Sequence, residues 1–155
     1  MVTDTQNDAV AACAVQALRT ALGDKLVAIV LFGSHARGEA SEGSDYDLLV
    51  IAEDLPARLF DRYLRLKQIL PPECRGRVSI LPKTPGQFHG AVPGLYLDIA
   101  LDGQALYDPR GFAGERLGSL RRQIDQLGLR RERTPEGFDW RWNRPPAGPW
   151  SLSWS

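Results

Sequence analysis

The sequence predicts an α/β (α+β) fold, with a mixed β-sheet of about four to five strands flanked by helices. The first observation is a continuous apolar run over residues 26–32, which is typical of a buried strand. The second is the helical spacing of apolar residues in several other segments. The expected elements are a helix over 8–22, strands over 26–32 and 46–52, a helix over 56–70, strands over 77–81, 95–101 and 104–107, and a helix over 108–127.

The first half of the chain alternates helix and strand signals. Apolar side chains recur at helical spacing in the first helix, and Gly23 follows as a stop. The next run lies between two glycines and consists of strand formers, and residues 46–52 repeat that pattern. Residues 56–70 carry one apolar face. Pro56 suits a first helical turn, and the two prolines after residue 70 prevent continuation.

The second half begins with a short strand candidate and a loop rich in proline and glycine that reaches residue 94. Residues 95–101 are then interpreted as a strand because they are almost entirely apolar. The pair Asp102-Gly103 is a hairpin signal, which makes 104–107 the expected partner strand. The last helix has apolar residues at spacings of three, four and three, and Gly128 ends it.

The domain organisation follows from where this pattern stops. Residues 1–129 are expected to form one domain, and residues 130–155 an irregular C-terminal tail that is rich in tryptophan and proline. All four tryptophans lie in this tail, so part of it should dock either on the domain or on a partner. A homo-oligomer therefore remains open. The sequence shows no internal repeat and no second domain.

Composition and charge are those of an ordinary globular protein. The 155 residues are 43% hydrophobic and 25% charged, with a formal net charge of zero, so the sequence lacks a general electrostatic footprint for nucleic acid. Cys13 and Cys74 lie in no zinc-binding pattern. The N-terminus is unlike a secretory signal, and no apolar run is long enough to span a bilayer. We therefore expect a soluble, cytoplasmic protein.

The informative segment runs from the end of the first strand to the start of the second. Asp45 and Asp47 open the second strand and should point to the same face, where two neighbouring carboxylates need a counter-charge. Mg²⁺ fits, because it takes oxygen ligands from carboxylates and substrate phosphates. Gly33 and Ser34 follow the first strand and offer backbone N–H groups and a hydroxyl to a phosphate. Together these features indicate phosphoryl or nucleotidyl transfer.

These residues also resemble a known family. The signature is a hydrophobic residue, Gly-Ser, a variable residue and Ala-Arg-Gly, followed after a short spacer by Ser-Asp-x-Asp-Leu. Residues 32–38 and 44–48 match every position. The segment resembles the nucleotidyltransferase superfamily that includes DNA polymerase β, and most closely its small bacterial and archaeal minimal nucleotidyltransferases. The resemblance implies the nucleotidyltransferase fold over roughly residues 8–127.

The resemblance also implies roles for particular residues. Asp45 and Asp47 would bind two Mg²⁺ ions, and Gly33 and Ser34 would hold the triphosphate of the substrate. Arg37 would contact phosphate or pair with a neighbouring acid. Ser44 would shape the loop or touch the metal-bound phosphates.

The family has a third carboxylate on a later strand. Asp98 is our choice, as a lone acid within an apolar run, and it would act as a third catalytic and metal-binding residue. Asp102 is the competitor, although it is better explained as part of a turn.

The function implied is transfer of a nucleoside monophosphate, with AMP the first choice, from an NTP such as ATP to an acceptor hydroxyl, with release of pyrophosphate. Small members of the family are often antitoxins of HEPN-type RNase toxins, and some attach AMP to a tyrosine of the toxin. The first hypothesis is therefore a protein adenylyltransferase whose partner is such a toxin.

Two alternatives remain. One is a small-molecule enzyme that resembles aminoglycoside nucleotidyltransferases, and the other is a module that binds nucleotide or a partner without turnover. Template nucleic acid is not an expected partner, because no thumb or duplex-binding region is recognisable.

Overall fold

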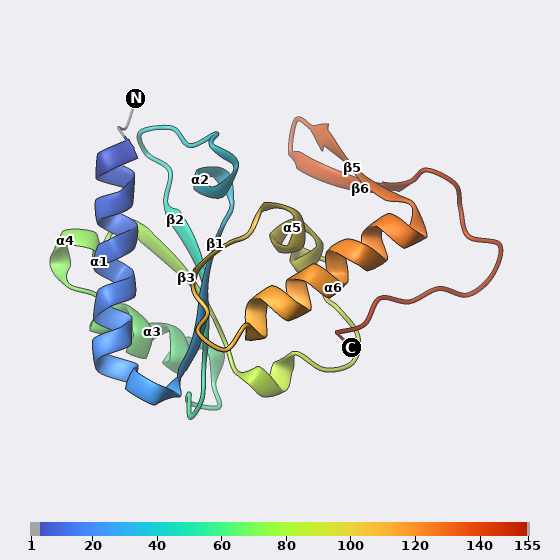
Figure 1. Cartoon of the computed structure of the whole chain (residues 1–155). Helices are drawn as coiled ribbons and strands as arrows, with labels where there is room; N and C mark the ends of the chain where they lie inside the picture. The colour runs from blue at the N-terminus through green and yellow to red at the C-terminus, as the bar shows by residue number, and fades with distance from the viewer. Residues whose placement is uncertain (1–3, 155) are drawn as a thin grey trace.

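The computed structural model describes residues 4–154, with side chains from residue 9 onward. Its main sheet has four strands in the order β3-β2-β1-β4. The helices pack on both faces of this sheet (Figure 1). The elements are α1 (Asp4–Leu22), η1 (Gly23–Lys25), β1 (Leu26–Phe32), α2 (Ser34–Arg37), β2 (Tyr46–Ala52), α3 (Leu59–Ile69), α4 (Pro72–Arg75), β3 (Val78–Lys83), η2 (Pro85–Gln87), α5 (Leu95–Asp102), β4 (Gln104–Tyr107), α6 (Phe112–Leu127), β5 (Leu129–Thr134) and β6 (Gly137–Trp142).

The sheet is mixed, as the sequence predicts. β1 pairs antiparallel with both β2 and β4, whereas β3 pairs with β2 in parallel. The connection from β2 to β3 therefore crosses over, and it contains α3 and α4. The predicted mixed α/β fold with about four strands is confirmed.

Two apolar layers separate the helices from the sheet. One layer joins α1 and α3 to strand residues such as Leu48 and Val50, and the other joins α5 and α6 to Leu49 and Ile51. Successive residues of β2 thus alternate between the two layers, as the strand period of two requires. Because Asp47 is two residues before Leu49, its side chain belongs to the face that α5 and α6 cover.

The prediction of a strand over 95–101 was wrong, because this segment is helix α5. A short apolar run does not separate a strand from a buried helix by its pattern. Here the helical spacing of four places Asp98 and Asp102 on one side of the helix, while Tyr96, Ile99 and Ala100 are buried. The Asp102-Gly103 pair is therefore the end of a helix and not a hairpin turn. Residues 104–107 do form a strand, but its partner is β1.

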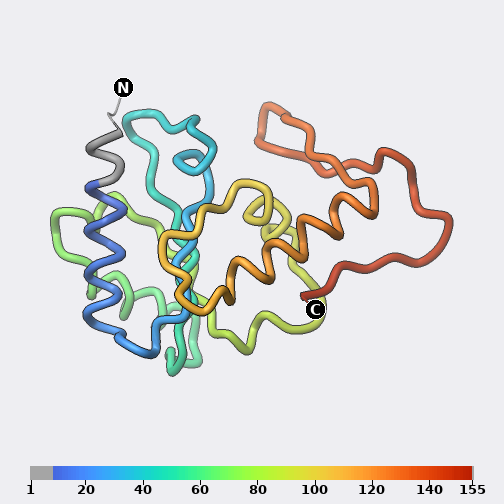
Figure 2. Tube along the Cα trace, viewed as in Figure 1, coloured from blue at the N-terminus to red at the C-terminus, as the bar shows by residue number. Residues whose placement is uncertain are grey.

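The tail also differs from the irregular segment that the sequence predicted. Residues 129–142 form an antiparallel hairpin, β5–β6, in which Arg131 pairs with Trp140 and Arg133 with Phe138. Beyond the hairpin the chain loops outward and returns to the domain (Figure 2). Trp154 is 5% exposed and packs edge-on against Phe88 and Tyr96, with ring centroids 4.9 and 4.8 Å apart. The tail thus docks on the core of its own chain.

Within the part of the chain that the structure describes, no helix combines the length and the apolar character needed to cross a membrane.

The burial of Trp154 predicts that the end of the tail contributes to stability. Trp154→Ala should lower the free energy of unfolding by about 3 kcal/mol, because a large buried aromatic side chain is replaced by a cavity. Trp150→Ala is the control, since this side chain is 51% exposed, and it should cost less than about 1 kcal/mol. Urea unfolding measures both, and equal effects would show that the docking of Trp154 adds no stability.

Candidate active site

The residues of the signature meet at one edge of the sheet. β1 ends at Phe32, Gly33 and Ser34 start the single turn of α2, and the chain returns to begin β2 at Tyr46. Because the two strands are antiparallel, Phe32 and Asp47 are direct register partners. The end of one strand and the acidic start of the next therefore lie side by side, as the sequence predicts.

Gly33 and Asp47 are in close contact. Gly33 has a backbone φ of 76°, which residues other than glycine rarely adopt. A Cβ atom built on Gly33 would lie 2.1 Å from Oδ2 of Asp47. A glycine is required here for two reasons, the backbone conformation and the space taken by the carboxylate. This contact fixes the Asp47 carboxylate directly against the Gly33-Ser34 turn.

The Asp47 carboxyl lies in an unfavourable place for a negative charge. Burial raises its pKa above the usual value, and the negative charge of Asp45 raises it further. His35 and Arg37 oppose this shift but do not cancel it. Asp45 itself is exposed to solvent just before β2. A cation next to the two carboxylates would relieve this repulsion.

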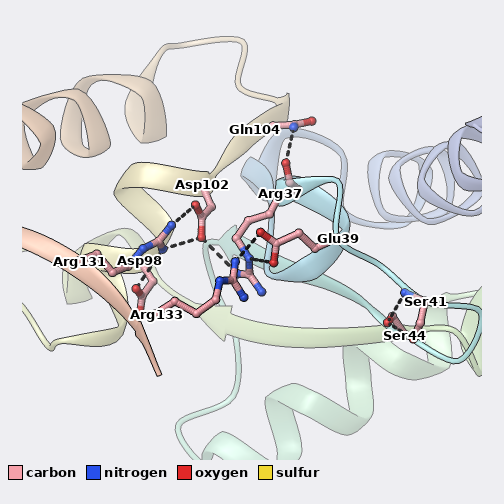
Figure 3. Close-up of polar contacts among 10 residues, drawn as sticks. Arg37, Glu39, Ser41, Ser44, Asp98, Asp102, Gln104, Arg131 and Arg133 are labelled. Carbon is pink, nitrogen blue, oxygen red and sulfur yellow. Dashed lines mark hydrogen bonds and ion pairs between the residues drawn. The ribbon is translucent and has the colours of Figure 1, made fainter. Parts of the chain in front are cut away.

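His35 and Ser44 shape the loop between α2 and β2. The His35 ring stacks on Tyr46, with centroids 3.7 Å apart, and its Nε2 lies 2.9 Å from the carbonyl oxygen of Ser44. The Ser44 hydroxyl accepts a hydrogen bond of 3.0 Å from the backbone N–H of Ser41 (Figure 3). Both side chains thus brace the loop that carries Asp45.

Arg37 belongs to a group of arginines around the ring of Phe138, which we call the arginine cluster. The guanidinium carbons of Arg37, Arg131 and Arg133 lie 5.0, 4.0 and 4.8 Å from the ring centroid. Arg131, Arg133 and Phe138 all come from the hairpin. The cluster therefore joins the turn of α2, which follows the Gly33-Ser34 pair, to the C-terminal hairpin.

Acidic side chains from α5 and the signature loop neutralise the arginine cluster. Arg131 donates two hydrogen bonds of 2.8 Å to Asp102 and one of 3.1 Å to Asp98. Arg37 donates to Asp102 at 3.2 Å, and Arg133 donates to Glu39 at 2.6 Å. Figure 3 shows these ion pairs converging between α5, the hairpin and the loop. Arg37 is thus held by acids, which is the structural alternative left open by the sequence.

Asp102 is the most deeply buried acid in this network, with 8% of its side chain exposed. Burial alone would raise its pKa, but the hydrogen bonds from Arg131 and Arg37 outweigh burial and hold the pKa below its usual value. The hydrogen bonds that Arg131 donates to Asp102 also raise the pKa of Arg131. Asp102 is therefore a charged partner of arginine and not a free ligand.

The structure brings together only part of the predicted metal set. Asp45 and Asp47 lie at the same sheet edge, whereas Asp98 lies on a helix, where it is paired with Arg131. Among the side chains that the structure describes, those of residues 9–154, no three acidic, histidine or cysteine groups lie close enough together to hold a metal ion. The expected trio of Asp45, Asp47 and Asp98 does not come together in this arrangement.

Sequence reasoning missed two features of this region. The first is the pairing of Asp47 with Ser79 of β3, and the second is the pair of hairpin arginines, Arg131 and Arg133. The alternation of Phe138, Trp140 and Trp142 with the charged residues Asp139 and Arg141 is a strand pattern that could have revealed the hairpin.

Residues 15–81 match the family model of the nucleotidyltransferase domain. This stretch extends from α1 through the Gly33-Ser34 turn and the Asp45–Asp47 pair into β3. The segment that carries the candidate site is therefore similar to the nucleotidyltransferase domain, which is the family that the signature resembles.

Individual relatives are similar to shorter stretches of the chain. A Methanocaldococcus jannaschii protein provisionally named a protein adenylyltransferase is 52% identical over 56 residues, which are 36% of this chain and 38% of the relative. The protein adenylyltransferase MntA of Thermococcus cleftensis is 39% identical over 56 residues, or 36% of this chain and 54% of MntA. The matches thus span about half or less of these relatives.

Solved structures include a partial match. One chain from the complex of a tri-AMPylated HEPN toxin of Shewanella oneidensis with an MNT antitoxin aligns with a TM-score of 0.45 at 17% identity. The alignment covers 77% of this chain and 90% of that one.

The contact between Gly33 and Asp47 predicts a strong effect of a single methyl group. Gly33→Ala should lower the free energy of unfolding by about 2 kcal/mol, because the backbone conformation is unfavourable for alanine and the methyl group meets the carboxylate. Gly43→Ala is the control, since no atom lies within 4 Å of its Cβ position. It should change stability by less than about 0.5 kcal/mol in the same urea titration. A Gly33 variant as stable as the control would contradict the contact.

The raised pKa of Asp47 predicts that its charge destabilises the protein when no cation is present. The ionised carboxylate lowers stability above the folded-state pKa, and this effect disappears below the unfolded-state value of about 3.9. Asp47→Asn should therefore melt roughly 2–5 °C higher than wild type at pH 7 in EDTA, and the gap should close towards pH 3. Asp139→Asn, on the exposed hairpin, should show no such gain. A lower melting temperature for Asp47→Asn at pH 7 would refute the prediction.

Proposed function

We propose that this chain is a Mg²⁺-dependent nucleotidyltransferase that transfers AMP from ATP to a hydroxyl group and releases pyrophosphate. The observation that carries the proposal is the contact between the Asp47 carboxylate and the Gly33-Ser34 turn, with Asp45 next to it. In this contact a carboxylate, which would bind a cation, lies beside a Gly-Ser turn, which would bind a phosphate. Nucleotidyl transfer needs both at the same phosphate.

The two carboxylates suit one Mg²⁺ ion together with substrate phosphates, because Mg²⁺ is commonly held by one or two carboxylates and by phosphate oxygens. Asp45 and Asp47 would hold the ion, and burial together with the charge of Asp45 raises the pKa of Asp47, so a bound cation would stabilise its ionised form. When bound, Mg²⁺ would supply charge neutralisation for the triphosphate. Gly33 would let the backbone approach a phosphate closely, and the Ser34 hydroxyl would donate a hydrogen bond to it.

Arg37 has a positioning role in this proposal. Its guanidinium is already engaged by Asp102 and Glu39, so it ties the turn of α2 to α5. Gln104 of β4 supports the same turn through a 2.9 Å hydrogen bond from Nε2 to the carbonyl oxygen of Ala36. Two independent contacts therefore hold the short helix that follows Ser34. Ser44 likewise acts by keeping the shape of the loop.

A protein hydroxyl is the acceptor that we favour. Relatives named protein adenylyltransferase are similar to 56-residue stretches of this chain, at 52% and 39% identity. A tyrosine of a HEPN-type toxin is the specific candidate, which would make this chain an antitoxin. The free thiols of Cys13 and Cys74, whose Sγ atoms are 2.8 Å apart, fit a reducing compartment such as the cytoplasm, where ATP and Mg²⁺ are also available.

One observation favours a second candidate, a nucleotide-binding module that turns over slowly or not at all. Asp98 and Asp102, which were the sequence candidates for a third carboxylate, are both committed to Arg131. Binding of nucleotide needs only the carboxylate pair and the turn, whereas rapid transfer also needs activation of the acceptor.

The test is transfer of label from α-³²P-ATP in a lysate of the host, with Mg²⁺, by wild type and by the double variant Asp45→Asn/Asp47→Asn. A labelled product made by wild type alone supports the transferase and identifies its acceptor. The double variant should lose more than about 100-fold in rate, since removal of metal ligands removes transition-state stabilisation. Asp139→Asn is the control for a lost exposed carboxylate and should keep full activity.

Equal labelling by wild type and the double variant would refute the proposal. Binding of ATP with no labelled product, repeated with the other three nucleotides, would favour the binding module.

A further inference from the structure

The strand register identifies the residues next to Asp47 on the two adjacent strands. In β1 the partner of Asp47 is Phe32, and in the parallel strand β3 it is Ser79. Neighbouring strands lie about 4.8 Å apart, so paired residues have adjacent side chains on the same face. Neither neighbour is acidic.

The burial pattern confirms which way Ser79 points. In β3 the side chains of Val78 and Ile80 are buried in the layer beneath α1 and α3. The side chain of Ser79 must then lie on the opposite face, which is the face of Asp47. Ser79 is partly exposed there. It occupies the sheet position from which a carboxylate on β3 would reach a cation held by Asp47.

Helix α5 covers the same face of the sheet, but its acids do not supply the carboxylate that β3 lacks. Asp102 receives three hydrogen bonds from two guanidinium groups, and Asp98 receives one from Arg131. Freeing either carboxylate would leave a largely buried arginine, with 13% of its side chain exposed, short of its partners. The fold thus keeps both acids away from the carboxylate pair.

We propose that Ser79 leaves the site with a single cation position, held by Asp45, Asp47 and substrate phosphates, in place of the two that the family resemblance implies. This inference rests on the proposed function. A hydroxyl carries no charge and is a weak ligand for Mg²⁺, so two aspartates would face four positive charges from two ions. The second cation position, which would activate the acceptor, is the one that lacks an anionic ligand from β3. The chain therefore binds ATP with one ion and transfers its nucleotidyl group slowly.

The first test counts bound cations. Mn²⁺ replaces Mg²⁺ in an EPR titration of the full chain, together with an ATP analogue that carries a methylene bridge between the α- and β-phosphorus atoms. Wild type should bind one Mn²⁺ per bound analogue, Ser79→Asp should bind two, and Ser79→Asn should bind one. The asparagine variant is the matched control, because it has nearly the same size as aspartate without its charge.

A second measurement follows the rate of AMP transfer by the same variants. Ser79→Asp should raise the rate by roughly tenfold or more, because the added carboxylate completes a position for acceptor activation. Arg131→Met, which releases Asp98 and Asp102, should still bind one Mn²⁺ if Ser79 is the missing position. Two ions bound by Arg131→Met would overturn the assignment to Ser79 in favour of α5.

The outcomes separate this inference from the proposed function. Two Mn²⁺ ions on wild type would overturn the inference while supporting the nucleotidyltransferase site. Loss of the analogue and of all Mn²⁺ from wild type, matching the double variant Asp45→Asn/Asp47→Asn, would overturn both. The wild-type count decides the matter even if Ser79→Asp does not fold.

Discussion

The contact between Gly33 and the Asp47 carboxylate is the constraint on which the rest of the site depends. Antiparallel pairing of β1 with β2 brings the end of one strand against the start of the other, and the absence of a side chain at Gly33 leaves room for a carboxylate. The same contact partly buries that carboxylate, which makes its charge costly without a cation. A functional group is thus maintained at the expense of stability, as is common where charge is gathered for binding.

A second set of acids, unlike Asp47, is neutralised by nearby arginines. Asp98, Asp102 and Glu39 are each matched by an arginine of the arginine cluster, so the negative charge of these acids is already satisfied within the fold. The unsatisfied and the satisfied acids both lie on the side of the sheet that α5 and α6 cover. Only the pair that begins β2 is left to attract a cation. Proximity of carboxylates to the signature is therefore a poor guide to their role, and their partners are a better one.

The sequence predicted the parts of the structure that depend on short-range patterns. The continuous apolar run of β1, the second run of β2 and the signature between them determine the edge of the sheet, and all three are local.

What the sequence did not predict depends on distant partners. An apolar run of eight residues folds as α5 because it packs on the sheet and because Arg131, far along the chain, pairs with two acids that lie one helical turn apart. The hairpin went unrecognised for a similar reason, since its arginines and aromatics are distributed over two strands. The sequence alone does not indicate that Ser79 lies next to Asp47, because that follows from the strand register.

The order of these contacts along the chain has a consequence for synthesis on the ribosome. Gly33, Ser34, Asp45 and Asp47 all lie between the start of β1 and the end of β2, so the contact between Gly33 and Asp47 depends on early residues and a local strand pairing. The arginine that neutralises α5 emerges much later, and Trp154 emerges last. During translation the nascent domain therefore carries extra exposed negative charge on α5 until the hairpin is complete. Folding of the hairpin and of the segment after it is then driven by ion pairing with the acids of α5 as well as by burial of aromatic residues.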